Sequence, residues 1–204
     1  MAGPLIEELT PRVRPRRTPR QLAAPIRRFD LAVERAFVTM RGRPMIDRAL
    51  YTASELGDHG LLWHLLATAQ GVRRGGDLAG TARVVTIMGI ESAIVNGAVK
   101  SMFRRQRPVH DGPRPHRLRT PLTSSFPSGH ASAAAVFTVV AGEDDPAAPA
   151  YALLATLVAA SRVHVRIHHP SDVLGGALIG TALGFGLRWW WPKGRLLPRG
   201  LGRR

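Results

Sequence analysis

Apolar stretches separated by charged segments are the feature that most limits what this chain can fold into. Each apolar run is shorter than the roughly 20 residues that cross a bilayer as a helix, but uncharged flanks lengthen several of them. The runs are rich in Ala and Gly, which lets membrane helices approach closely. This pattern predicts an all-α, membrane-embedded helical bundle with about five spans, rather than a soluble bundle of Ala-rich helices. The runs are 61–72, 84–99, 131–142, 150–160 and 173–187.

The two ends of this region carry signs of a membrane surface. Residues 189–191 are three tryptophans, followed by Pro192 and Lys193, and such residues gather at the lipid–water boundary. At the other end, residues 26–40 place apolar side chains at helical spacing among five charged ones. That helix is too charged for an ordinary span. We expect it to be an N-terminal amphipathic helix that lies in the interface or, alternatively, packs on the rest of the protein.

Charge is concentrated in both tails and in one central segment, and the net charge of +15 predicts an anionic partner. We expect a disordered basic tail over 1–25, one domain over 26–192 and a basic C-terminal tail over 193–204. Nucleic acid is not expected as a partner, because aromatic residues do not alternate with the arginines of 101–126. Cysteine is absent, which excludes disulfides and thiolate metal sites.

Three short motifs carry the chemistry that the chain offers. Together they provide three fixed cations, a helix-start loop, two histidines and an aspartate. Residues of these types can bind a phosphate group and cleave its ester through a histidine nucleophile. The motifs are KSMFRRQRP at 100–108, PSGH at 127–130 and SRVHVRIHHPSD at 161–172.

The first and third motifs supply the cations. Lys100 and Arg107 are seven residues apart, so they share one helix face if the helix continues until Pro108 ends it. Arg162 comes from a different segment. Three cations from two segments can neutralise the charged oxygens of a phosphoryl group, whereas each alone would be an ordinary residue at a helix end.

The second motif predicts a phosphate contact through the backbone. Ser128 is a favoured N-cap, and Gly129 allows the backbone to approach a ligand closely. Free N–H groups at a helix start bind phosphate oxygens, and His130 then stands beside that phosphate as a candidate general acid. Alone, PSGH would indicate only a capped helix.

The third motif adds a candidate nucleophile. His168 and Asp172 are four residues apart around Pro170, which suits the first turn of a helix. Asp172 is then able to bind one ring nitrogen of His168 and leave the other free to attack phosphorus. His164 and His169 flank His168, but neighbouring histidines do not easily face one ion from regular structure. We therefore expect no metal or other cofactor.

The three motifs together resemble the pattern of the type 2 phosphatidic acid phosphatase (PAP2) family: K-x6-RP, PSGH, then SR-x5-H-x3-D. The motifs cover residues 100–172, and the apolar pattern extends the match to about 59–191. The resemblance implies an all-helical bundle and metal-independent hydrolysis through a phosphohistidine. It implies His168 as nucleophile, Asp172 as its orienting residue and His130 as general acid. The phosphate-binding residues that it implies are Lys100, Arg107, Ser128, Gly129 and Arg162.

The resemblance also implies a membrane lipid phosphatase. The candidate substrates are phosphatidic acid, phosphatidylglycerol phosphate, a polyprenyl diphosphate and a polyprenyl-linked phosphosugar. One alternative is a vanadium haloperoxidase-like enzyme, against which the apolar runs argue. A second is a non-catalytic membrane protein that binds anionic lipid, against which His130, His168 and Asp172 argue.

The family resemblance favours an outward-facing site, and the Arg-, Ala- and Gly-rich composition suggests a bacterial plasma membrane. Residues 193–204 would then lie in the cytoplasm. Integral members of the family commonly have six spans, and the charged helix over 26–40 departs from that pattern. The residues do not specify an oligomeric state.

Overall fold

Helices account for all regular secondary structure in the part of the chain that the computed structural model describes, residues 24–109, 118 and 121–201. The all-α prediction is thus confirmed. All five predicted apolar runs fall on helices. These are α3 (Leu61–Arg73), α4 (Leu78–Ser92) with its π-helical continuation η2 (Ala93–Val99), α5 (Gly129–Ala141), α6 (Ala148–His164) and α7 (Pro170–Trp190).

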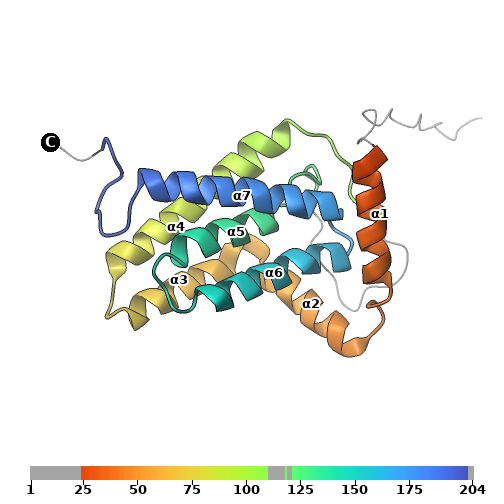
Figure 1. Ribbon diagram of the computed structural model, residues 1–204, viewed down its shortest axis with the longest axis horizontal. Coiled ribbons are helices and arrows are strands. Elements are labelled where there is room, and N and C mark those ends of the chain that lie inside the picture. The colour runs from red at the N-terminus through yellow and green to blue at the C-terminus, as the bar shows by residue number, and fades with distance from the viewer. Residues whose placement is uncertain (1–23, 110–117, 119–120, 202–204) are drawn as a thin grey trace, which may run out of the picture.

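Two helices precede the bundle. α1 (Ala24–Val38) corresponds to the predicted amphipathic helix, and it packs on α6 and α7. α2 (Pro44–Leu56) was not predicted; it begins with Pro44 in its first turn and leads into the 3-10 turn η1 (Asp58–Gly60). α1 lies at one end of the long axis, and the chain beyond α7 lies at the other (Figure 1). The predicted tail over 1–25 falls almost entirely outside the described residues.

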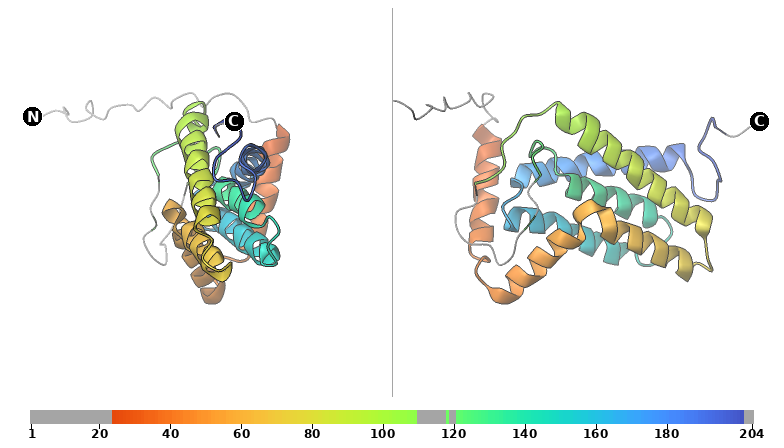
Figure 2. Two further views of the ribbon diagram at one scale, coloured as in Figure 1. Left: turned by 90° about the vertical axis from the view of Figure 1, so that its left-hand side faces the viewer. Right: turned by 180° about the vertical axis from the view of Figure 1, so that it is seen from behind.

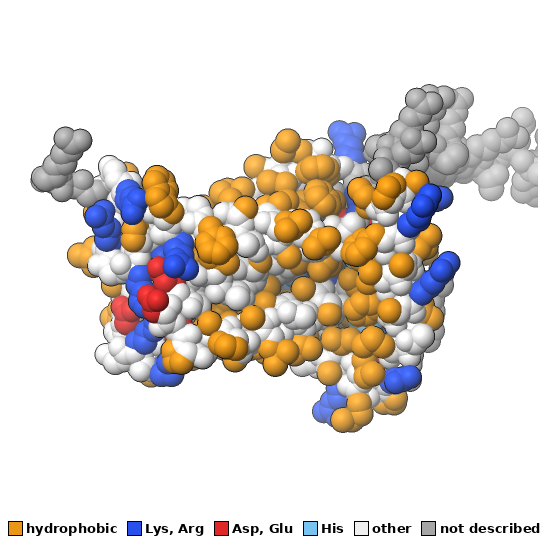
Figure 3. Space-filling model, viewed as in Figure 1, with side chains coloured by type: hydrophobic (Ala, Val, Ile, Leu, Met, Phe, Trp, Pro, Cys, Tyr) orange, Lys and Arg blue, Asp and Glu red, His pale blue; other side chains and the backbone are white. Residues whose placement is uncertain are grey.

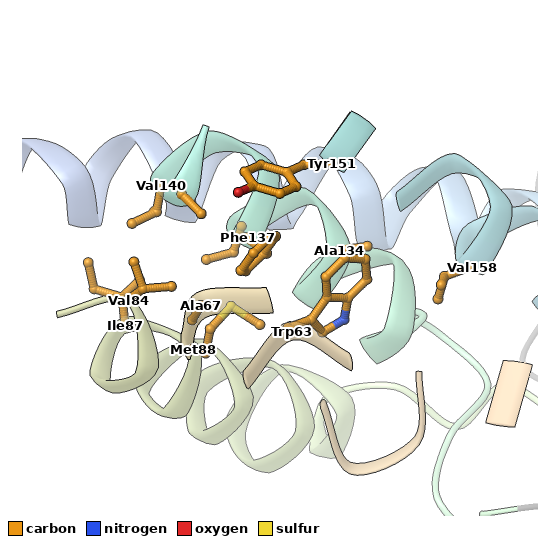
Figure 4. Close-up of a cluster of buried hydrophobic side chains, with 12 residues drawn as sticks. Trp63, Ala67, Val84, Ile87, Met88, Ala134, Phe137, Val140, Tyr151 and Val158 are labelled. Atoms are coloured by element: carbon orange, nitrogen blue, oxygen red, sulfur yellow. The ribbon is translucent and has the colours of Figure 1, made fainter. Parts of the chain in front are cut away.

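α5 is the central helix. α6 and α7 cover one side of it, and α3 and α4 cover the other, as the front and back views show (Figures 1 and 2). Between them lies a buried apolar cluster (Figure 4). In this cluster the ring of Phe137 lies 5.1 Å from that of Trp63 and 5.2 Å from that of Tyr151, so one side chain of α5 links α3 to α6.

Glycines on α7 bring it unusually close to α5. Gly176 and Gly180 face α5 with no side chain between the two backbones. A Cβ atom at Gly176 would lie 2.3 Å from the carbonyl oxygen of Ser128, and one at Gly180 would lie 2.3 Å from that of Ser132. This is the close approach that small residues allow between membrane helices. It holds the first turn of α5 against the second and third turns of α7.

The surface has the character of a membrane protein. On the face drawn in Figure 3, hydrophobic side chains cover the middle of the molecule, and charged side chains gather toward its two ends. Two helical segments, Leu78–Val99 and Pro170–Trp190, are long and apolar enough to cross a bilayer. α3 and α5 have 13 residues each and α6 has 17. The expected total of about five spans stays a prediction.

The contact between α5 and α7 yields a stability prediction. Gly180→Ala places a methyl group against the Ser132 backbone and must separate the helices, at a cost of about 1–3 kcal/mol. Gly186→Ala is the matched control on the same helix, since nothing lies within 4 Å of that position. Thermal unfolding in detergent should show a lower midpoint for Gly180→Ala alone. Equal midpoints for both variants would contradict this account of the packing.

Candidate active site

His168 is held in a buried turn between α6 and α7. The backbone N–H groups of Ile167 and His168 both donate to the carbonyl of Arg162 at 3.1 Å, which turns the chain back toward the bundle. The His168 side chain is only 2% exposed. Its Nδ1 lies 3.7 Å from Asp172 Oδ2, and its Nε2 lies 3.3 Å from Arg107 Nη1. One ring nitrogen therefore faces an anion and the other faces a cation suited to phosphate.

Asp172 is fully buried and tightly held. It is the third residue of α7, and its Oδ2 accepts from the backbone N–H of His169 at 2.8 Å in a capping box. The hydroxyl of Ser125 donates to the same oxygen at 2.5 Å, and the Arg105 guanidinium donates to Oδ1. A buried carboxylate with this many donors has a fixed orientation. It can fix the ring of His168 in turn.

His168 is neutral in this environment. Burial is the main cause that lowers its pKa to about 3, and the charges of Arg162 and Arg107 act in the same direction, against the nearby carboxylate of Asp172. Only a neutral imidazole has a lone pair for attack on phosphorus. The nucleophilic form is therefore present at every ordinary pH.

The segment that carries Lys100 and Arg107 differs from the predicted single helix. The helix that contains Lys100 ends within the next two residues, and 103–108 has no regular secondary structure, so Lys100 and Arg107 do not share a helix face. The prediction of one continuous helix up to Pro108 was wrong. Arg107 instead donates from this irregular segment to the carbonyls of Pro121 and Ile167, both at 3.0 Å. These bonds satisfy backbone groups that no helix satisfies there.

Lys100 and Arg162 are both buried, at 8% and 1% exposure. Arg162 lies in the last turn of α6 and donates to the hydroxyl of Ser54 on α2. Burial, with the charges of Arg107 and Arg162, lowers the pKa of Lys100 to about 8, against the opposite effect of Glu91 and Asp172. The mutual repulsion of these cations indicates a region that would stabilise an anion.

The PSGH segment begins α5 as predicted. Ser128 is the N-cap, its side chain accepts from the N–H of Ala131, and its own N–H donates to the carbonyl of Asp172 at 3.0 Å. Gly129 is the first residue of the helix and lies against the side chain of Asn96. His130 follows in the first turn. Its Nε2 lies 3.0 Å from Oδ1 of Asp58, a residue outside the three motifs.

Two further residues support the site without belonging to the predicted set. Asp30, the buried residue of α1, accepts from Arg105 Nη2 at 2.7 Å and from the N–H of Ser171 at 2.7 Å. Arg105 thus joins Asp30 to Asp172. The sequence contains one indication that Asp30 is buried. Asp30 falls on the same helical face as Val33 and Phe37, where an acidic residue is unexpected.

Among the residues that the structure describes, no group of three or more His, Asp or Glu side chains is arranged to hold a metal ion. His164 is buried and hydrogen-bonded through Nε2 to Asp47 at 2.7 Å, and it packs beside Phe37 and Tyr51. It therefore serves the packing of α6 against α2 and α1.

Comparison with known proteins now identifies the family. The model of the PAP2 superfamily matches residues 80–195. The chain belongs to the PAP2 superfamily. It is 32% identical over 142 residues to decaprenylphosphoryl-5-phosphoribose phosphatase of Mycolicibacterium smegmatis, covering 67% of this chain and 74% of that protein. The Mycobacterium tuberculosis enzyme of the same name is 30% identical over 159 residues, covering 76% of this chain and 84% of that one.

Two solved structures share the fold. The PAP2-type transmembrane phosphatidylglycerolphosphate phosphatase of Bacillus subtilis has a TM-score of 0.61 at 23% identity, over 82% of this chain and 86% of its own. Aquifex aeolicus LpxE has a TM-score of 0.61 at 24% identity, over 78% and 94%. The chain is therefore a hydrolase of PAP2 type, and the apolar helices agree with a membrane protein.

The lowered pKa of Lys100 predicts how phosphate binding changes at alkaline pH. An ammonium group is charged below its pKa, so the free enzyme loses this cation as the pH rises through about 8. We expect inorganic phosphate, tested as a competitive inhibitor, to bind less tightly above that pH, because one of the cations that would hold it is lost. Lys100→Arg keeps its charge and should move this loss of affinity to higher pH. An unchanged pH profile in Lys100→Arg would contradict the assignment.

Proposed function

We propose that this protein is a membrane lipid phosphatase that acts through a phosphohistidine at His168. The observation that carries the proposal is the environment of the His168 ring. The ring is buried and neutral, with the Asp172 carboxylate near Nδ1 and the Arg107 guanidinium near Nε2. A guanidinium is a cation that commonly binds phosphate. The lone pair of such a ring lies on Nε2, beside Arg107, so a phosphate oxygen bound by Arg107 would lie next to the attacking nitrogen.

The proposed reaction has two displacements. His168 Nε2 attacks phosphorus, a P–N bond forms, and the P–O bond to the lipid breaks with its electron pair leaving on oxygen. His130 gives that oxygen a proton. Water then attacks the phosphohistidine and gives a proton to His130, the P–N bond breaks, and inorganic phosphate leaves.

The phosphoryl oxygens are proposed to be held by Lys100, Arg107 and Arg162, with the backbone at Ser128 and Gly129. The charges of Arg107 and Arg162 both act on Lys100, and those of Lys100 and Arg162 both act on His130. Such preorganised cations stabilise the charge that develops during transfer.

A polyprenyl-linked phosphosugar is the substrate that we propose first. The curated relatives are named for decaprenylphosphoryl-5-phosphoribose, and they match at 30–32% identity over most of their length. Phosphatidylglycerol phosphate is second, since it is the substrate in the name of a structural neighbour with lower identity. Phosphatidic acid and polyprenyl diphosphates complete the set.

We further propose that the site faces outward from a bacterial plasma membrane. The end opposite the site carries basic residues in or beside its loops, among them Arg73, Arg74, Arg188 and Lys193, as expected of a cytoplasmic side. The chain has no cysteine, so single cysteines report sidedness. In intact cells an impermeant maleimide should label Met102→Cys but not Leu196→Cys. The reverse pattern would overturn the proposed orientation.

Phosphate release tests the function directly. Purified protein in detergent with EDTA should release phosphate from the polyprenyl-linked phosphosugar faster than from the other lipid phosphates. His168→Ala should lose at least about a thousandfold of that rate, because its nucleophile is gone. A thermal unfolding midpoint close to wild type confirms that the variant is folded. Equal release by His168→Ala, or none from any lipid phosphate by wild type, would refute the proposal.

A further inference from the structure

One acidic residue outside the three motifs contacts a histidine that is inside them. Asp58 Oδ1 lies 3.0 Å from His130 Nε2, and Asp58 is the one hydrogen-bond partner that the described part of the chain gives to this ring. Burial opposes the ionisation of Asp58. The hydrogen bond to His130 and the charges of His130 and Arg162 outweigh it and hold the pKa of Asp58 below its ordinary value. The pair therefore contains a carboxylate.

The backbone around Asp58 is shaped to make this contact. Gly57 leaves room for the His130 ring: a Cβ atom there would lie 2.7 Å from His130 Cδ2 and 3.0 Å from Val158 Cγ1. His59 and Gly60 follow with φ of 55° and 70°, so the chain makes a left-handed bend directly after Asp58. A non-glycine residue in this region is uncommon and carries strain, which persists where the surroundings fix it.

We propose that Asp58 is the positioning residue of the general acid His130, an inference that rests on the function proposed above. Asp58 accepts a hydrogen bond from the Nε2–H group of His130 and so leaves Nδ1 as the nitrogen that serves the leaving-group oxygen. It also stabilises the imidazolium form, which alone can act as the acid. The site then contains two Asp–His pairs with opposite tasks: Asp172 orients a neutral nucleophile, and Asp58 supports a protonated acid.

The proton balance of the reaction follows from this arrangement. In the first displacement the P–O bond breaks, and the proton on His130 Nδ1 moves to the leaving oxygen. His130 is then neutral, with its remaining proton on Nε2 directed at Asp58. In the second displacement Nδ1 takes a proton from the attacking water. The imidazolium is restored, and Asp58 itself never changes protonation.

The surroundings explain why a carboxylate is needed here. Burial is the largest influence on the His130 ring and disfavours a positive charge there. Arg162 from α6 and Lys100 from the end of η2 act in the same direction, and Asp58 from η1 is the group that opposes all three. Its loss should therefore move the alkaline limb of kcat to lower pH, because the acid form of His130 would deprotonate sooner.

Asp58 could instead serve only to fix Arg162, whose charge also acts on it. The leaving group separates these roles. An alkoxide needs a proton as it departs, whereas a nitrophenolate departs without one. Damage to phosphate binding or to the fold lowers the rate for both substrates equally, while damage to the general acid lowers only the alkyl rate.

The experiment compares kcat/KM for an alkyl phosphate and a nitrophenyl phosphate that carry the same hydrocarbon tail. Asp58→Asn should lower the alkyl value about 30- to 300-fold and the nitrophenyl value less than threefold. Asp58→Glu should recover part of the alkyl rate. Asp144→Asn is the matched control, since Asp144 is 81% exposed and its positive φ suits asparagine. It should behave as wild type with both substrates.

Two results would overturn the inference. One is an equal loss for both substrates in Asp58→Asn, which would assign Asp58 to Arg162 or to stability. The other is an unchanged alkyl rate. Failure of the proposed function looks different, because wild type would then release no phosphate from either substrate, or His168→Ala would remain as active as wild type.

Discussion

The buried carboxylate of Asp172 is the group on which the rest of the site depends. A charge removed from water is costly unless donors surround it, and here Arg105, Ser125 and the His169 N–H do so. The three donors come from three separate segments: the one after Lys100, the loop before α5 and the turn before α7. The carboxylate thus ties the irregular segment after Lys100 and the start of α7 to one point. The ring of His168 rests against that same point.

The packing of α5 against α7 extends this constraint into the bundle. Because Gly176 lets the Ser128 backbone approach α7, the helix start proposed to bind phosphate lies next to Asp172, the residue proposed to orient His168. The Ser128 N–H donates to the Asp172 carbonyl across this contact. Helix packing and site geometry are therefore set by the same atoms. Ser128 and Asp172 are thus placed by helix starts, whereas His168 lies in the turn before α7 and Arg107 in the irregular segment after Lys100.

Much of this arrangement could be read from residue types, since apolar runs mark buried or lipid-facing helices and motif spacing brings polar groups to helix ends. α3 to α7 and the junction at Pro170 were predicted in this way. α2 was not predicted, because its polar residues obscure the helical spacing of its apolar residues. Asp58, Asp30 and Arg105 were missed for a different reason: each acts through a contact with a segment distant in sequence, and no local pattern records such a contact. The supposed helix through Arg107 failed because backbone carbonyls of a neighbouring loop compete for that guanidinium.

The central claim is that phosphate passes through His168 on its way from lipid to water. It is tested most directly by stopping the enzyme during turnover of a lipid phosphate with alkali, in which phosphohistidine survives, and locating the phosphoryl group by mass spectrometry. The account predicts a phosphoryl group on His168, lost on exposure to acid and absent from His168→Ala. A phosphoryl group on another residue, or continued turnover with an unmodified protein, would contradict it.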